Sequence, residues 1–158
     1  MAETPHTKSN NLEKKPTVSL IIPTYQAESF IVQSLERLIA YAQSTPHIQE
    51  ILLIDDGSKD QTPETITQYL VKHPNSCIKF TALKQNVGKG TAIKSGMQIA
   101  SGDHIIFTDC DLPYAFSDID ELIHTLQDKQ TDVAIGSRMH PNSVYHIRSH
   151  NLSYIYIR

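Results

Sequence analysis

Short apolar runs alternate with longer stretches of helical periodicity along most of the chain. The runs are rich in Val, Ile, Leu and Phe and are bounded by turn-forming residues, a pattern typical of buried strands. Between them, apolar residues recur at three- and four-residue spacing, which predicts amphipathic helices. The predicted strands are 18–22, 50–54, 77–83, 104–108 and 132–135, and the predicted helices are 30–42, 62–71, 90–99 and 117–126.

Three of these elements carry local signals for where they begin or end. Pro23 follows the first run and predicts that the strand stops there. Thr62 precedes Pro63, so Thr62 is the predicted N-cap and Pro63 the first helical residue. Ser117 is the predicted cap of the last helix.

The alternation of strand and helix with short connections predicts an α/β fold with a doubly wound, mostly parallel sheet and helices on both faces. Ligands bind such sheets outside the carboxyl ends of the strands, near a switch in strand order. Polar or glycine-rich clusters follow all five predicted strands, at residues 23–25, 55–58, 86–90, 109–111 and 136–138. Because these clusters would share one edge of the sheet, the sequence predicts a common binding crevice.

Composition is that of a globular protein with one sizeable core. The chain has 158 residues, of which 39% are hydrophobic and 20% charged. A formal net charge of -3 gives no electrostatic reason to expect nucleic acid as a partner. The two cysteines, Cys77 and Cys110, lack metal-site spacing, and we expect both to be reduced in an intracellular protein.

The first 16 residues are polar and contain neither an apolar signal region nor a cleavage site. We expect residues 1–16 to form a flexible tail and residues 17–158 to form the domain. No apolar run reaches the roughly 18 residues that a membrane-spanning helix needs. The expected location is the cytoplasm, with any membrane contact made peripherally at the cytoplasmic membrane face.

Asp109 and Asp111 follow the fourth predicted strand with one residue between them. Residues two apart in an extended segment point the same way, about 6 to 7 Å apart. Repulsion between two such anions is relieved by a raised pKa, a cationic partner or a divalent metal. The alternative is that one carboxylate caps a turn and the other is solvated. Beside the other clusters, the pair suits Mg²⁺ or Mn²⁺ bridged by a diphosphate.

Asp55 and Asp56 follow the second predicted strand in a turn with Gly57. Asp and Gly favour turns for local reasons alone. An ionised carboxylate is also a strong acceptor for the donor edge of a base or for ribose hydroxyls. Both interpretations remain open for this pair.

Lys89 lies between two glycines immediately before a predicted helix. An ammonium, backbone N–H groups and a helix N-terminus together suit a phosphate. The loop is neither a Walker A motif nor a dinucleotide fingerprint. Arg138 would add positive charge at the same edge, although a single Arg in a loop also serves in surface ion pairs.

The motifs at residues 18–25, 55–62, 86–92, 100–103 and 109–112 occur in the order found in a known family. As a set they resemble the family 2 inverting glycosyltransferases of GT-A fold. Residues 136–140, with Arg148 and Ser149 downstream, are similar to the dolichyl-phosphate β-glucosyltransferase branch and its relatives that use polyprenyl phosphate. The resemblance covers about residues 17 to 149.

The resemblance implies a Rossmann-like GT-A fold and a metal-dependent transferase. The expected donor is a nucleotide-sugar, with UDP-glucose favoured, and the expected acceptor is a polyprenyl or dolichyl phosphate at a membrane surface. Transfer would proceed with inversion, while Mg²⁺ or Mn²⁺ stabilises the leaving nucleoside diphosphate as a Lewis acid. Because a phosphate acceptor is already an anion, no general base is required.

The resemblance also implies roles for individual residues. Asp111 would be the main metal ligand, Asp109 would help to hold ribose or metal, and Asp55 or Asp56 would hold the base. The loop expected to close over the nucleoside contains Pro23, Thr24, Tyr25 and Glu28. Lys89 and Arg138 would face the diphosphate or the acceptor phosphate, and the catalytic candidates are Asp111 and Arg138.

Three features depart from the family pattern. The usual Asn-Glu-Glu after the first strand is Gln26-Ala27-Glu28 here and keeps only the last acid. Cys110 replaces a small residue within the acidic pair, and we interpret it as filler because Mg²⁺ and Mn²⁺ prefer oxygen ligands. The family continues beyond the position of Arg158 through an acceptor-binding segment, so we expect the domain to be incomplete at its C-terminus.

Two other functional classes are alternatives to a transferase. A non-catalytic nucleotide-sugar-binding protein, or an inactive truncated transferase, would need the donor motifs alone. A phosphoacceptor receiver domain would need an acidic pair after the first strand and a Lys after the last, where this chain has Pro23 and Ser137-Arg138. His146 and His150 are spaced to share a helix face, but without an accompanying Glu they are interpreted as exposed histidines.

Overall fold

The structure, a computed structural model, describes residues 16–74, 76–128, 131–137 and 139–141. The chain divides into two compact units, residues 1–116 and 117–158, and each is described by itself. The expected tail lies almost entirely outside the described residues, as do His146 and His150.

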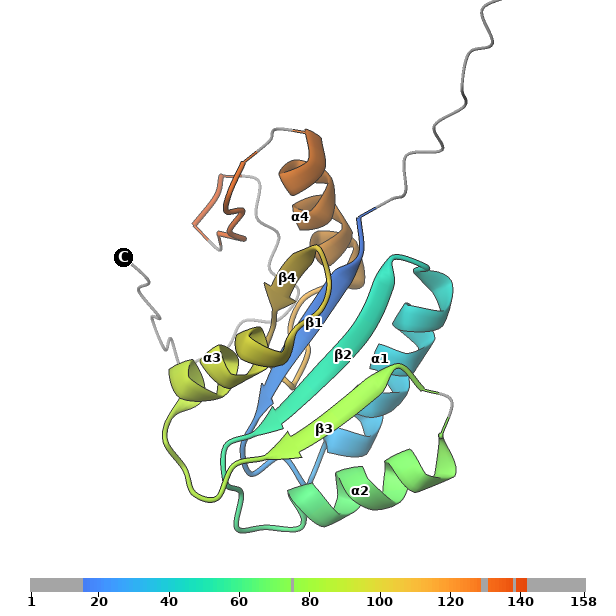
Figure 1. Ribbon diagram of the computed structural model, residues 1–158, viewed down its shortest axis with the longest axis vertical. Coiled ribbons are helices and arrows are strands. Elements are labelled where there is room, and N and C mark those ends of the chain that lie inside the picture. Colours follow the sequence, from blue (N-terminus) through green and yellow to red (C-terminus); the bar gives the residue numbers. More distant parts are fainter. Residues whose placement is uncertain (1–15, 75, 129–130, 138, 142–158) are drawn as a thin grey trace, which may run out of the picture. The chain divides into compact units, whose positions relative to one another are not determined.

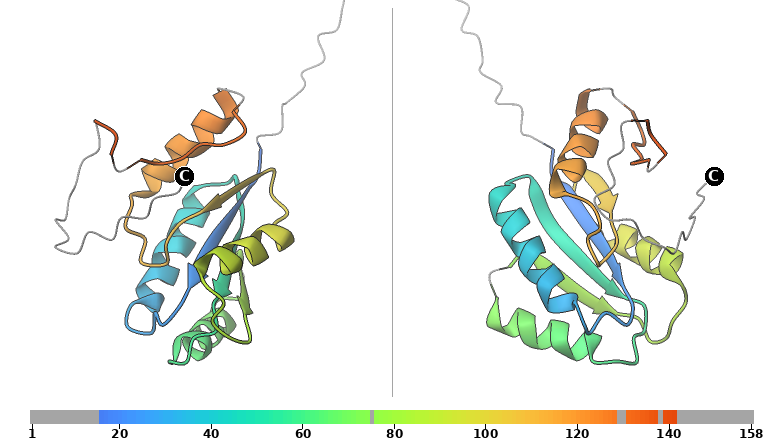
Figure 2. Two further views of the ribbon diagram at one scale, coloured as in Figure 1. Left: turned by 90° about the vertical axis from the view of Figure 1, so that its left-hand side faces the viewer. Right: turned by 180° about the vertical axis from the view of Figure 1, so that it is seen from behind.

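The first unit is built on a four-stranded parallel sheet of order β3-β2-β1-β4 (Figure 1). Its strands are β1 (Val18–Thr24), β2 (Ile48–Asp55), β3 (Ile78–Ala82) and β4 (His104–Phe107). Its helices are α1 (Ile31–Ser44), α2 (Thr62–Lys72) and α3 (Lys89–Ile99). Helices α1 and α3 cover opposite faces of the sheet (Figure 2), and α2 packs beside α1 and β3. The predicted parallel α/β sheet is confirmed.

The core lies around the two central strands. All seven residues of β1 are buried, and β2 is buried except at one position. On one face, Ile21 and Leu52 pack with Ala92 of α3. A Cβ on Gly96 would lie 2.7 Å from Cγ2 of Ile21, so the missing side chain lets α3 approach β1 closely. On the other side α1 buries a stripe at helical spacing, made of Ile31, Leu35 and Leu38.

The prediction that Pro23 stops the first strand was wrong. Pro23 pairs in register with Ile54, and β1 continues to Thr24. The carbonyl of Ile21 accepts the N–H of Thr108 on the β4 side. Pro23, two residues further along, faces that same side, where pairing with β4 has already ended. The missing N–H of proline therefore costs no ladder hydrogen bond.

Two further strand predictions need correction. Residues 132–135 form no strand, and Val133 and Ile135 are 70% and 72% exposed. Four residues offer few ladder hydrogen bonds, too few to order an isolated segment. The strand predicted at 104–108 was expected to be buried, but the observed β4 is an edge strand of the described sheet. Ile106 is buried, whereas Ile105 and Phe107 are 41% and 42% exposed.

Neither residue predicted as a helix cap occupies a cap position, because Thr62 and Ser117 both lie within their helices. Gln61 occupies the N-cap position of α2 and Thr62 lies within the helix, where its hydroxyl accepts the N–H of Ala27. In the second unit, α4 (Phe116–Asp128) begins one residue before Ser117. None of the helices in the described part of the chain is long and apolar enough to cross a membrane.

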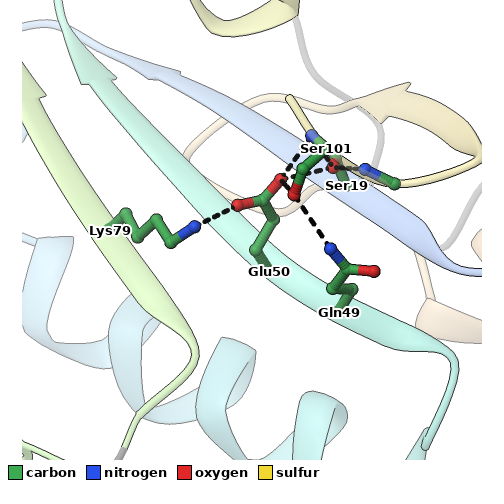
Figure 3. Close-up of polar contacts among 6 residues, drawn as sticks. Ser19, Gln49, Glu50, Lys79 and Ser101 are labelled. Atoms are coloured by element: carbon green, nitrogen blue, oxygen red, sulfur yellow. Dashed lines mark hydrogen bonds and ion pairs between the residues drawn. The ribbon is translucent and has the colours of Figure 1, made fainter. Parts of the chain in front are cut away.

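A buried carboxylate connects the strands near their amino ends (Figure 3). Oε1 of Glu50 accepts hydrogen bonds from Ser19 Oγ of β1 at 2.7 Å and from the N–H and hydroxyl of Ser101 at 2.8 Å each. Its Oε2 accepts Lys79 Nζ of β3 at 2.6 Å. The carboxylate thus joins β2 to both neighbouring strands and to the turn before β4.

These contacts determine the ionisation of Glu50. Burial would raise the pKa of this carboxyl, but the bonds from Lys79, Ser19 and Ser101 outweigh burial and lower the pKa from 4.5 to about 2. The folded state therefore binds the proton less tightly than the unfolded state. The resulting stabilisation is fully present above about pH 5 and is lost as the pH falls from about 4.5 toward 2.

Replacement of Glu50 by Gln should destabilise the fold at neutral pH by about 2 to 3 kcal/mol, because the buried network loses its charge and Lys79 faces an amide. Chemical denaturation at pH 7 measures this loss. The variant should also show a smaller decrease in unfolding free energy between pH 5 and pH 3 than the parent protein.

Glu64→Gln is the matched control, since Glu64 is an exposed residue of α2. It should change the unfolding free energy by less than about 0.5 kcal/mol. An equal loss in the two variants would contradict the role assigned to the Glu50 network.

Candidate functional site

The clusters that follow β1 to β4 meet at the carboxyl edge of the sheet. Direct contacts join them in pairs. The N–H of Asp56 donates to the carbonyl of Thr24, and the N–H of Gln26, just after the first cluster, donates to Ser58 Oγ. The loop before α3 donates to the carboxylate of Asp56, and Lys89 of α3 forms an ion pair with Asp109. The predicted convergence of these four clusters on one edge is confirmed.

Residues 25–28 and 58–62 form a loop clasp, the name used here for these two segments together. Besides the contact from Gln26, the N–H of Ala27 donates to Thr62 Oγ1 at 2.8 Å. The N–H of Glu28 donates to Asp60 Oδ2 at 3.3 Å, and Glu28 Oε2 accepts the N–H of Gln61 at 2.8 Å. Glu28 therefore connects the two segments in both directions.

Asp60 remains ionised within the clasp. Burial would raise its pKa, but hydrogen bonds from the hydroxyl and N–H of Thr62 and the N–H of Glu28 outweigh burial and lower the pKa below its ordinary value. The sequence signal for this role was ambiguous, because Asp60 and Thr62 also fit a simple capping pattern.

Asp55 and Asp56 have different partners inside the protein. The carboxylate of Asp55 accepts the N–H and the hydroxyl of Ser58 at 2.8 and 2.5 Å. The carboxylate of Asp56 accepts the N–H groups of Val87 and Gly88 at 2.9 and 2.8 Å. Both aspartates are buried. Asp56 thereby holds the loop that leads into α3.

A pocket of about 500 Å³ opens beside these loops. Asp55 and Tyr25 line it together with residues 82–86, and the Tyr25 side chain is 42% exposed. Gly57 has a φ of +67°, and a Cβ there would lie 2.3 Å from the carbonyl carbon of Gln85. Only glycine allows the two walls of the pocket to approach so closely.

Pro23 and Thr24 lie within β1 and are not among the residues that line this pocket. Both residues are buried, and Thr24 is 1% exposed. The Thr24 hydroxyl has no hydrogen-bond partner among the described residues. A buried hydroxyl without a hydrogen-bond partner is unusual. Here it lies at the carboxyl end of β1.

The acidic pair after β4 lies on a turn and not on an extended segment, which corrects the expected geometry. The N–H of Leu112 donates to the carbonyl of Asp109 at 3.1 Å, and Leu112 adopts a φ of +48°. Asp109 is 35% exposed and Asp111 is exposed. Burial of Leu112 and a 3.3 Å hydrogen bond from Arg37 Nη1 to its carbonyl hold this left-handed turn.

Cys110 is a neutral thiol between the two carboxylates. Burial raises its pKa most, and the charges of Asp111 and Asp109 raise it further, to about 11. Metals bind the thiolate, so a thiol that stays protonated at neutral pH is a poor ligand. The chemistry supports the interpretation of Cys110 as filler.

The residues present fit a divalent cation that takes part of its coordination from a bound ligand. Asp111 presents an exposed carboxylate and Asp109 a partly exposed one, which are oxygen donors suited to Mg²⁺ or Mn²⁺. Within the described ranges no group of three or more His, Cys, Asp or Glu side chains could hold a metal alone. Further oxygen ligands would have to come from a diphosphate or from water.

Arg138 lies outside the described residues, and Gly136 and Ser137 belong to the second unit. The expected role of residues 136–138 at the crevice therefore stays a prediction. Sequence reasoning missed the contacts of Arg37, whose guanidinium also lies 5.6 Å from the ring centre of Phe116. Their partners come from distant positions, and no local pattern indicates them.

Comparison with known protein families matches residues 19–157 to "Glycosyl transferase family 2". A dolichyl-phosphate beta-glucosyltransferase of Dictyostelium discoideum is 32% identical over 131 residues, which cover 78% of this chain and 40% of that protein. An undecaprenyl-phosphate 4-deoxy-4-formamido-L-arabinose transferase of Serratia proteamaculans is 31% identical over 119 residues, which cover 75% of this chain and 36% of that protein. The chain spans about 40% of the length of these curated relatives.

Solved structures show the same fold. S. aureus TarS 1-349 in complex with UDP superposes with a TM-score of 0.51 and 30% identity, covering 67% of this chain and 32% of that one. Mannosyltransferase PcManGT from Pyrobaculum calidifontis, in complex with GDP-Man and Mn2+, gives a TM-score of 0.55 at 24% identity, with coverage of 63% and 28%. The GT-A architecture expected from the sequence is confirmed.

Replacement of Asp56 by Asn should release the loop before α3. An amide can accept through one atom only, so one of the two N–H groups, of Val87 or Gly88, would face another donor. Hydrogen exchange of these two amides should become faster by about tenfold or more. Amide exchange measured by NMR or by mass spectrometry of peptides from residues 84–90 tests this expectation.

Asp103→Asn provides the control, because Asp103 accepts hydrogen bonds from Thr17 at the opposite edge of the sheet. It should leave exchange at Val87 and Gly88 unchanged. Unaltered exchange in Asp56→Asn would show that the Asp56 contacts do not hold the loop.

Proposed function

This chain belongs to glycosyl transferase family 2, and from that premise we propose that it transfers a sugar from a nucleotide-sugar to a polyprenyl or dolichyl phosphate with inversion. UDP-glucose is the favoured donor, because the relatives include dolichyl-phosphate beta-glucosyltransferases and the TarS structure holds UDP. The whole reaction is a proposal, since the chain spans about 40% of those relatives.

One observation carries the proposal. A pocket, a lysine at the start of a helix and an acidic pair follow successive strands and lie at one edge of the sheet. A nucleotide-sugar presents a base and ribose, a diphosphate and a sugar in linear order. The pocket suits the nucleoside, and Lys89 with Asp109 and Asp111 suits the diphosphate and its cation.

The nucleoside is held in the pocket beside the loop clasp. Asp55 is the candidate acceptor for a donor group of the base, because it lines the pocket and holds the corresponding place in the family motif. Tyr25 offers an exposed ring for stacking. Asp56 and Glu28 hold the loops around the pocket, and Pro23 and Thr24 form the end of β1 from which the first loop leaves.

The diphosphate is held at the edge formed by α3 and the turn after β4. Asp111 and Asp109 would hold a Mg²⁺ or Mn²⁺ ion, which would supply Lewis-acid stabilisation of the leaving diphosphate. Lys89 adds an ammonium at the same place. The attacking group is a phosphate oxygen of the lipid, already anionic, so no side chain has to remove a proton from it.

In this proposal the lipid-phosphate acceptor is bound at a membrane surface, on the cytoplasmic side. Arg138 is the candidate cation for the acceptor phosphate or the diphosphate, by its place in the family motif. A second candidate function is binding of the nucleotide-sugar without transfer. It is favoured by the fact that the groups assigned within the described residues all serve the donor.

Replacement of Asp111 by Asn should weaken metal-dependent UDP binding by at least about tenfold, because a direct oxygen ligand loses its charge. Calorimetric titration with UDP in the presence of Mn²⁺ measures the effect. Because Asp111 is exposed, the variant should keep the stability of the parent. Asp103→Asn is the control and should bind UDP normally, while unchanged binding by Asp111→Asn would disprove its assigned role.

Transfer of radiolabelled glucose from UDP-glucose to a polyprenyl phosphate in detergent micelles distinguishes the two functions. Formation of the lipid-linked sugar, or hydrolysis of the donor, would exclude the purely binding role. Saturable donor binding without either product would support it. Absence of binding to both UDP-glucose and GDP-mannose would contradict both.

A further inference from the structure

The position of Lys89 conflicts with the local electrostatics of its helix. Lys89 is the first residue of α3, where the helix dipole places a partial positive charge and favours acidic side chains. No acidic residue lies in the first turn of α3, and no side chain caps it. By contrast, α2 has Glu64 in its first turn and Lys72 in its last. A residue that breaks such a rule often does so at a functional site.

The compensating anion of Lys89 comes from the neighbouring strand end. Its ammonium forms an ion pair with Asp109 Oδ1, and the two side chains are 44% and 35% exposed. An ion pair with this much solvent contact is weak and exchangeable. In the Glu50–Lys79 pair the lysine is also exposed, at 67%, but the carboxylate is only 2% exposed and is fixed by further hydrogen bonds from Ser19 and Ser101.

Hydrogen bonds fix the backbone just before Lys89, whereas the Lys89 side chain can change its conformation. Asp56 accepts the N–H groups of Val87 and Gly88, the two residues before Lys89. The lysine side chain is a flexible four-carbon stem that carries a single, strongly hydrated charge. Its ammonium can therefore change partners without movement of the loop.

Asp109 is also one of the two carboxylates assigned to the divalent cation. We propose that Lys89 occupies Asp109 in the nucleotide-free protein, in the place that the divalent cation takes when the donor binds. The diphosphate then offers the ammonium new oxygen partners and releases Asp109. This inference rests on the proposed function and adds a coupling between its two ligands. The cation alone binds weakly, and the cation and the diphosphate each strengthen the binding of the other.

Such coupling is reciprocal, so it can be measured from the metal side without any sugar transfer. Mn²⁺ is titrated alone and with saturating UDP, and free Mn²⁺ is followed by electron paramagnetic resonance. In the parent protein UDP should tighten Mn²⁺ binding by about tenfold or more. In Lys89→Met, Mn²⁺ alone should bind about fivefold more tightly, because Asp109 has lost its competing cation. The enhancement by UDP should shrink correspondingly.

Two variants separate this effect from a general change in charge or folding. Lys94→Met removes the same charge from an exposed position of the same helix and should behave as the parent. Lys89→Arg keeps the charge and should keep most of the coupling. A damaged fold would weaken Mn²⁺ binding, whereas the proposal requires it to strengthen.

The failures of the two proposals are distinguishable. If UDP enhances Mn²⁺ binding in the parent and Lys89→Met leaves Mn²⁺ binding unchanged, the role of Lys89 is wrong and the proposed function stands. An identical gain in Lys94→Met would also overturn it, because the effect would then be one of net charge. If the parent binds no Mn²⁺ with either UDP or GDP, both proposals fail.

Discussion

The arrangement of the sheet depends on one buried carboxylate. Glu50 reaches β1 through Ser19, β3 through Lys79 and the turn before β4 through Ser101. These contacts lie near the amino ends of the strands, whereas the candidate site lies at the carboxyl ends. A change in the pairing register of a strand moves all of its residues relative to the neighbouring strand, so a shift at the amino end would also displace the loops at the carboxyl end. The Glu50 network at the amino edge therefore also helps to keep the four polar clusters in place at the carboxyl edge of the sheet.

At the carboxyl edge, the acidic side chains divide their work between structure and ligand. Asp56, Asp60 and Glu28 use their oxygens on backbone N–H groups of neighbouring loops. Asp111 is exposed, and Asp109 is shared with a lysine whose side chain can turn away. Carboxylates bound to the backbone are fixed acceptors, and exposed ones remain open to a cation. A site that binds a nucleotide-sugar together with a cation needs carboxylates of both kinds.

Much of the fold was predictable because its signals are local. Strand and helix positions followed from hydrophobic periodicity, and the shared edge followed from parallel topology. The errors arose where partners decide the outcome. Pro23 stays in β1 because β4 ends early, residues 132–135 form no strand, and Thr62 uses its hydroxyl on Ala27. For the site, the residue types indicated which side chains are candidates for ligand binding. They did not indicate that Asp56 holds a loop or that Lys89 contacts Asp109. Those facts depend on distances between segments far apart in the chain.

The loop clasp has a consequence for the thermodynamics of recognition. Its four hydrogen bonds join residues 25–28 to residues 58–62 through groups of the protein itself. Segments that order only on binding reduce affinity, because their lost conformational entropy is subtracted from the contact energy. Here the wall bearing Tyr25 has already lost that freedom during folding. The entropy lost in ordering this wall therefore lowers the stability of the folded protein and not the affinity for the ligand. A nucleoside would bind to a surface that already has its final shape.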